Sequence, residues 1–106
     1  METVVKILLN ENKAPARKLA DAELHFHGGE LDGLKLVGFA IWQRRDRAGC
    51  DVTFPSREFT IDGRRRRYAL LRAFGDPSAQ DHVRDLVLRA YAAYEATVRS
   101  GVASRA

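Results

Sequence analysis

Four consecutive arginines, Arg64–Arg67, follow the dipeptide Asp62-Gly63 and are followed in turn by Tyr68. Asp-Gly is typical of a tight hairpin turn. Guanidinium groups neutralise phosphates and release counterions, which is the main source of affinity for nucleic acids, and a tyrosine can stack on a base. On a strand the side chains alternate, so two arginines would share each face. The segment predicts nucleic-acid binding; the alternative is a solvated hairpin whose charges protect a sheet edge.

Further arginines cluster earlier in the chain. Arg44, Arg45 and Arg47 form a second basic turn, and Arg57 follows a proline-serine step. If these two sites lie at one end of a sheet they form one patch, which the hairpin at residues 62–63 or a second copy could extend. Arginine richness alone is weak evidence, because the abundant alanine indicates a GC-rich coding sequence. Taken singly, each of these arginines is more simply a solvated loop residue.

Glu23, His25 and His27 share one face of an alternating segment, at the His-x-His spacing that can chelate zinc or another divalent ion. A third strong ligand at a recognisable spacing is missing, since His82 lies at the start of the predicted C-terminal helix. The simpler interpretation is a polar, solvent-facing strand whose histidines titrate near neutrality. We therefore expect no cofactor and keep metal binding as a weak alternative.

Catalysis is not indicated by any motif. Ser56 has no histidine at a recognisable triad spacing and no nucleophile-elbow context. Gly28-Gly29 and Asp32-Gly33 are turn residues, because no phosphate-binding or dinucleotide-binding motif surrounds them. We expect a protein that is not an enzyme and has no small-molecule substrate.

Composition describes an ordinary single domain. The chain has 106 residues, of which 45% are hydrophobic and 30% charged, and 18 basic against 14 acidic residues give a net charge of +4. Cys50, the single cysteine, excludes an internal disulfide and is expected to be a small buried or half-buried strand residue. No run approaches membrane-spanning length and no secretory pattern opens the chain, so we expect a cytoplasmic protein without a membrane partner.

The elements that must position these residues are several strands followed by one helix. Apolar runs and strict alternation predict strands at residues 4–9, 20–27, 34–42 and 50–54, then a hairpin of 59–61 and 67–71. The third strand is almost continuously apolar and is expected to be covered on both sides, with Trp42 as a packing residue. Gly38 within it indicates a bulge or a close backbone approach, and Pro55 ends the fourth strand.

The last segment has the pattern of a helix. Asp76 can cap it with Pro77 at its first position, and Ser78 with Asp81 offers an alternative capping pair. Apolar residues then recur with helical spacing over residues 83–98, with Tyr91 and Tyr94 at packing positions. The sequence predicts an α+β fold: a mostly meandering antiparallel sheet of five to six strands, and one long C-terminal helix packed on it. We expect residues 1–99 to form one domain and residues 100–106 a flexible tail.

Several of these features occur together in a known family. They are the apolar strand ending at Trp42, a connection ending in Gly49, the segment Val52-Thr53-Phe54-Pro55-Ser56-Arg57, the Asp62-Gly63 turn and the helical run Val87-Leu88-Arg89-Ala90-Tyr91. In this order they resemble the stage V sporulation protein G (SpoVG) family of small bacterial regulators, from about Val4 to about Tyr94.

The resemblance implies a strand-rich fold with one long helix, dimerisation through the sheet, and sequence-selective DNA or RNA binding without catalysis. The chain departs from the family at Glu58, where a second basic residue is common. Its loop at residues 44–49 is longer and more charged, and Arg64–Arg67 is more basic.

We therefore expect a homodimeric regulator that binds nucleic acid through its arginine-rich turns. The predicted contact residues are Arg44, Arg45, Arg47, Arg57, Arg64, Arg65, Arg66 and Arg67. The main alternative is a non-catalytic protein-interaction module of the same fold, which would bind a partner through its sheet edge or dimer face. A metal-binding protein centred on Glu23, His25 and His27 is the third interpretation.

Overall fold

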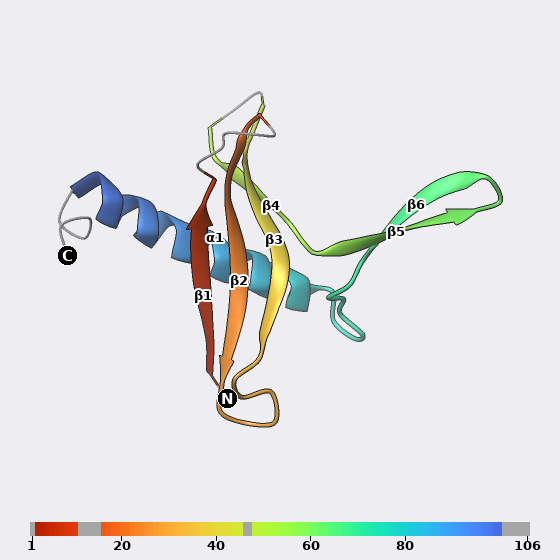
Figure 1. Ribbon diagram of the computed structural model, residues 1–106, viewed down its shortest axis with the longest axis horizontal. Coiled ribbons are helices and arrows are strands. Elements are labelled where there is room, and N and C mark those ends of the chain that lie inside the picture. Colours follow the sequence, from red (N-terminus) through yellow and green to blue (C-terminus); the bar gives the residue numbers. More distant parts are fainter. Residues whose placement is uncertain (1, 11–15, 46–47, 101–106) are drawn as a thin grey trace.

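The computed structural model describes residues 2–10, 16–45 and 48–100. It contains two antiparallel sheets and one long helix (Figure 1). The strands are β1 (Glu2–Leu9), β2 (Lys18–His27), β3 (Lys35–Gln43), β4 (Cys50–Thr53), β5 (Ser56–Ile61) and β6 (Arg64–Ala69), and the helix is α1 (Ser78–Ser100). The predicted α+β class, its antiparallel meander and its long C-terminal helix are confirmed. Arg47 and residues 101–106 of the predicted tail lie outside the described residues.

The strands divide between two sheets. β1 to β4 form a four-stranded meander, and β5 pairs only with β6. Pro55 explains the break, because it lacks the N–H group that a continuing strand would donate. The N–H group of Leu70 donates to the carbonyl oxygen of Pro55 at 2.7 Å, which closes the base of the hairpin. Residues 56–69, called the arm below, project away from the first sheet (Figure 1).

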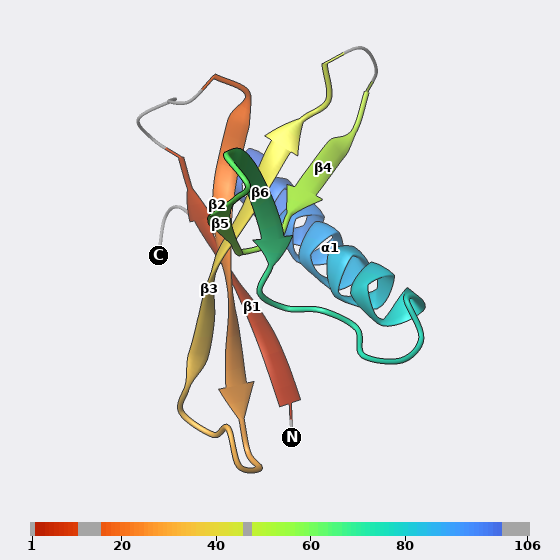
Figure 2. The same cartoon turned by 90° about the vertical axis from the view of Figure 1, so that its right-hand side faces the viewer.

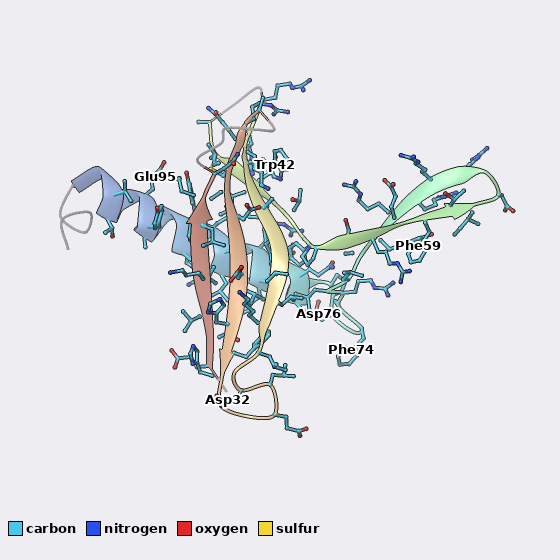
Figure 3. The ribbon with its side chains drawn as sticks, viewed as in Figure 1. Asp32, Trp42, Phe59, Phe74, Asp76 and Glu95 are labelled. Atoms are coloured by element: carbon cyan, nitrogen blue, oxygen red, sulfur yellow. The ribbon has the colours of Figure 1, made fainter. Side chains whose placement is uncertain are left out.

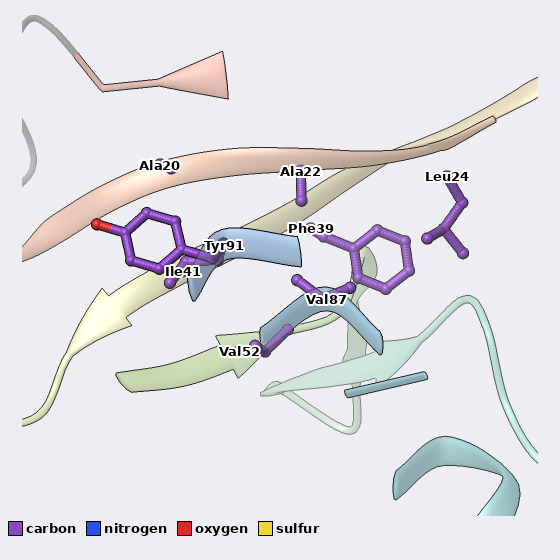
Figure 4. Close-up of a cluster of buried hydrophobic side chains, with 8 residues drawn as sticks. All are labelled: Ala20, Ala22, Leu24, Phe39, Ile41, Val52, Val87 and Tyr91. Carbon is purple, nitrogen blue, oxygen red and sulfur yellow. The ribbon is translucent and has the colours of Figure 1, made fainter. Parts of the chain in front are cut away.

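The helix covers one face of the first sheet, as the turned view shows (Figure 2). The strict alternation of β2 is the reason: Ala20, Ala22 and Leu24 face the helix and are buried, while the residues between them are half-buried. The buried core consists of Ala20, Ala22, Leu24, Phe39, Ile41, Val52, Val87 and Tyr91 (Figure 4).

Within the residues that the structure describes, no helix covers the opposite face of the first sheet, so the prediction that β3 is covered on both sides is wrong. Val37 is 49% exposed and Trp42 is half-buried on this face, whereas Tyr91 packs in the core as predicted. A strand can be apolar along its whole length and still have one uncovered face when small and aromatic residues occupy the positions that point to that face. We call this surface the open face; it is the face on which Trp42 and Glu23 lie.

The register of β2 with β3 shifts where Ala22 pairs with Phe39 and Leu24 with Leu36, which leaves a bulge around Gly38. Gly38 has φ +109° and Pro55 lies directly against it. The bulge and the close approach predicted for this glycine are both present.

The helix begins after an aspartate cap. Asp76 Oδ1 accepts a hydrogen bond from the N–H group of Ser78 at 2.9 Å, and this bond lowers the pKa of the Asp76 carboxyl. Asp81 instead pairs with Arg84 at 2.7 Å. The first of the two predicted caps is therefore used, and the helix continues through Ser100 into the segment expected as a tail.

Candidate nucleic-acid interface

The register of the arm sorts its side chains onto two faces. Residues directly opposite each other in an antiparallel pair project to the same side. The pairs Arg57–Tyr68, Phe59–Arg66 and Ile61–Arg64 therefore share one side, which we call the basic-aromatic face. Ser56–Ala69, Glu58–Arg67 and Thr60–Arg65 share the other, which we call the polar face. Two of the four consecutive arginines lie on each.

The turn between β5 and β6 has the backbone that its sequence predicts. Asp62 has φ 52° and Gly63 has φ 77°, so both central residues are left-handed, as a type I′ turn requires. This turn twists with the strands and keeps the register that separates the two faces.

On the basic-aromatic face, arginine and aromatic side chains interleave around Phe59, the residue of the arm labelled in Figure 3. The guanidinium carbon of Arg57 lies 5.1 Å from the centroid of the Phe59 ring, and the centroids of Phe59 and Tyr68 are 5.6 Å apart. Phe59 is 39% exposed and Tyr68 40%. Within the described parts of the chain, Arg57, Arg64 and Arg66 have no carboxylate partner. This face therefore combines unneutralised positive charge with accessible rings.

The polar face differs in charge. Glu58 Oε1 lies 3.7 Å from Arg65 Nη1, and Glu58 Oε2 lies 3.6 Å from Arg67 Nη2. Both pairs are long and solvent-exposed, so each contributes little to stability. They nevertheless place a negative charge beside the two arginines. Glu58 therefore directs most of the net positive charge of the arm to the basic-aromatic face.

The second basic turn lies apart from the arm. Arg44 Nε donates to Asp51 Oδ1 at 3.0 Å, and the Arg44 side chain lies against Gly49, so this arginine holds the turn together. Arg45 is exposed. β4, about 13 Å long, and residues 54–56 lie between this turn and Arg57. Among the described arginines, Arg44 and Arg45 therefore lie apart from Arg57, and the condition for a single patch, that these turns share one end of the sheet, is not met for them within one chain.

The Glu23–His25 pair lies on the open face. His25 Nε2 is 2.9 Å from Glu23 Oε1, and Lys35 Nζ is 3.3 Å from the same oxygen. The hydrogen bond with His25 is the main cause of a lowered pKa for Glu23, and Lys35 lowers it further against the opposing effect of burial. A lysine ammonium in this position repels a second cation. Residues 2–10, 16–45 and 48–100 contain no cluster of three potential metal ligands, so the metal-site interpretation gains no support.

Phe59 is the residue of this surface that our sequence analysis did not single out. The signal was present in the alternation of Arg57, Phe59 and Ile61, which places basic and apolar side chains on one face of a strand. The predicted contact residues were chosen by charge alone and therefore did not include Phe59.

Comparison of the chain with protein-family models, with curated proteins and with solved structures returned no match. Separately, none of the helical residues in the described ranges forms a span long and apolar enough to cross a membrane.

Proposed function

We propose that this protein is a nucleic-acid-binding regulator of the SpoVG type, without catalytic activity, which acts as a homodimer and binds through the basic-aromatic face of its arm. The observation that carries the proposal is the interleaving of Arg57, Arg64 and Arg66 with the exposed rings of Phe59 and Tyr68.

This face offers contacts for both the phosphates and the bases of a nucleic acid. Arginine presents a planar fork of donors that suits phosphate oxygens, and it carries its charge at every physiological pH. The exposed rings of Phe59 and Tyr68 offer flat surfaces on which bases stack. Since these arginines have no carboxylate partner in the described ranges, binding a phosphate breaks no ion pair of the protein.

The alternative of a purely protective hairpin explains this face less well. Charges that guard a sheet edge against aggregation have no need of exposed aromatic residues, which themselves promote association. Phe59 and Ile61 are 39% and 47% exposed on the same face as the arginines. Their position is better explained by a ligand that covers them.

The homodimer is supported by surface that one chain leaves uncovered. Phe74 is fully exposed in the loop between β6 and α1 (Figure 3). Leu70 at the base of the arm is 58% exposed. The Cα radius of gyration is 15.6 Å, against about 13 Å for a compact domain of this length. A two-stranded hairpin that stands alone is marginally stable. A second copy that packs on Leu70 and Phe74 would stabilise the base of each arm and leave its tip exposed.

A protein-interaction module is the second candidate, favoured by the same exposed apolar residues, Ile61 and Phe74. It predicts a defined protein partner and only weak, unselective binding of nucleic acid. The two candidates differ in what the arginines do, so the salt dependence of nucleic-acid binding separates them.

Fluorescence anisotropy of labelled single-stranded DNA, duplex DNA and RNA, each titrated at several salt concentrations, tests the proposal. With three phosphate contacts from one arm, the logarithm of the binding constant should fall against the logarithm of salt concentration with a slope of about −2 to −3, and about twice as steeply if both arms of a dimer bind the same molecule. Absence of binding to all three, even at low salt, would favour the interaction module.

A further inference from the structure

A cleft of about 550 Å³ lies between the base of the arm and the open face of the first sheet. Its volume falls within the range of small-molecule sites, which is about 300 to 1,000 Å³. The lining residues that carry the argument are Gly38, Trp42, Thr53, Pro55, Ser56 and Arg67. Ser56 and Arg67 belong to the polar face of the arm, so the cleft lies on the side away from the basic-aromatic face.

Trp42 forms an aromatic wall of this cleft. Its Nε1–H group donates to Thr53 Oγ1 on the neighbouring strand at 2.9 Å, which fixes the orientation of the indole. Because the one polar group of the ring is occupied, the indole has only its π faces and carbon edges to offer a ligand. Half-buried and held in this way, Trp42 is suited to stack on another flat ring.

The floor of the cleft depends on a missing side chain. Pro55 lies against Gly38 so closely that a Cβ atom at position 38 would be 2.8 Å from the proline Cβ. The missing side chain at position 38 therefore lets Pro55, and with it the base of the arm, pack directly on β3 at one end of the cleft.

The opposite side of the cleft carries charge and a hydroxyl group. Arg67 is 71% exposed, and its nearest carboxylate, Glu58, is 3.6 Å away in a weak pair that a phosphate can replace. Ser56 contributes a hydroxyl that can donate to or accept from the polar edge of a base. An aromatic wall, an arginine and a hydroxyl group together match the ring, phosphate and polar edge of one nucleotide.

We propose that this cleft receives a single unstacked nucleobase against Trp42, with the neighbouring phosphate on Arg67, so that the preferred ligand is single-stranded nucleic acid. The inference deepens the proposed function and rests on it. Arg66 and Arg67 are adjacent on β6 but project to opposite faces. A single strand that crosses this edge contacts the basic-aromatic face and places one base in the cleft. A duplex cannot do so, because its bases are paired and stacked on one another.

Trp42 is the only tryptophan of the chain, so its fluorescence reports directly on the cleft. A labelled single-stranded DNA of mixed sequence, the RNA of the same sequence and the DNA duplex are each titrated, with anisotropy of the label and emission of Trp42 followed together. Single strands should quench Trp42 in parallel with the rise in anisotropy, and duplex should leave its emission unchanged. Comparison of the two single strands decides between RNA and DNA as the source of the base.

Substitution at position 42 tests the stacking step. Trp42→Leu keeps an apolar side chain but removes the ring, and it should weaken single-strand binding about 5- to 150-fold. Duplex binding should change less than about twofold, because the duplex places no base in the cleft. Trp42→Phe retains a ring and should restore most of the affinity. Thermal unfolding of each variant shows whether its fold is intact.

Arg65 provides a matched control for Arg67. Both arginines lie on the polar face of β6, both are highly exposed and both are paired weakly with Glu58, but only Arg67 lines the cleft. Arg67→Ala should reduce both the affinity for single strands and the quenching of Trp42, while Arg65→Ala leaves the quenching amplitude unchanged.

The failures of the two proposals are distinguishable. The proposal that the cleft binds a base would be refuted if anisotropy showed binding without quenching of Trp42, or if the wild type and Trp42→Leu bound single strands equally well. Either result would still be compatible with binding through the basic-aromatic face. Absence of any rise in anisotropy would overturn the proposed function and this inference together.

Discussion

Gly38 and Pro55 approach so closely that a Cβ atom on the glycine would lie 2.8 Å from the Cβ of the proline. This contact joins the bulge of β3 to the residue that directs the chain out of the first sheet and into the arm. The position of the arm relative to the open face, and the cleft between them, therefore depends on the absence of a side chain at position 38.

Gly38→Ala should destabilise the protein by at least about 2 kcal/mol, because it combines an unfavourable φ with a clash against a proline that cannot move aside easily. Gly33→Ala is the matched control: Gly33 has φ +84° but open space around it, so only the backbone cost of about 1 kcal/mol applies. Urea unfolding of both variants measures the difference. Equal losses of stability would show that the Gly38–Pro55 contact is not tightly packed.

Asp76→Ala should lower the melting temperature at neutral pH, because it removes the acceptor for the N–H group of Ser78 at the start of α1. The pKa of Asp76 in the folded state is lowered from its ordinary value of 3.8. Its carboxylate therefore stabilises the fold above pH 3.8, and this contribution is lost as the pH falls through the folded-state pKa. The difference in melting temperature between wild type and variant should therefore disappear at acidic pH.

Asp85→Ala serves as the control for Asp76→Ala, since Asp85 is an exposed aspartate of the same helix, away from the cap. Its melting temperature should stay near that of the wild type at neutral pH. If the difference in melting temperature between wild type and Asp76→Ala stayed constant from neutral to acidic pH, a role for the charged cap would be contradicted.

Phe74→Asp should convert a dimer into a monomer, because it places a charge at the centre of the surface on which we propose the second copy is seated. The isolated fold should tolerate the change, since Phe74 is fully exposed within one chain. Size-exclusion chromatography with light scattering gives the mass. Leu34→Asp, another exposed apolar residue at the turn between β2 and β3, should remain dimeric. A wild-type protein that is monomeric at high concentration would refute the dimer.

Much of the fold could be predicted from the sequence, because its strongest signals are local. The alternation of residues 20–27 specifies a strand with one buried face. Asp62-Gly63 specifies the tight turn between β5 and β6, independently of the surrounding structure. The second sheet could not be predicted in the same way. In the arm, basic and apolar residues share one face and neither kind is buried, so its pattern does not show which surface of the protein the arm faces, or that it faces none.

The candidate site was predicted in part. The sequence identified the arginines of the arm but could not separate them from Arg44, which resembles them in type and turns out to pair with Asp51. Trp42 was expected to be a packing residue because it ends an apolar strand, yet it lines a cleft on the open face. Both distinctions depend on contacts between strands, which spacing along the chain does not encode.

The most direct test of the central claim compares two double variants that each lose two positive charges. Arg64→Ala/Arg66→Ala removes charge from the basic-aromatic face, and Lys6→Ala/Arg89→Ala removes it from β1 and α1. We predict that the first lowers nucleic-acid affinity roughly 10- to 50-fold near 0.1 M salt and makes the salt slope shallower by about 1 to 2. The second should change affinity less than about threefold, the effect of long-range charge alone. Equal losses of affinity in the two variants would contradict binding through this face of the arm.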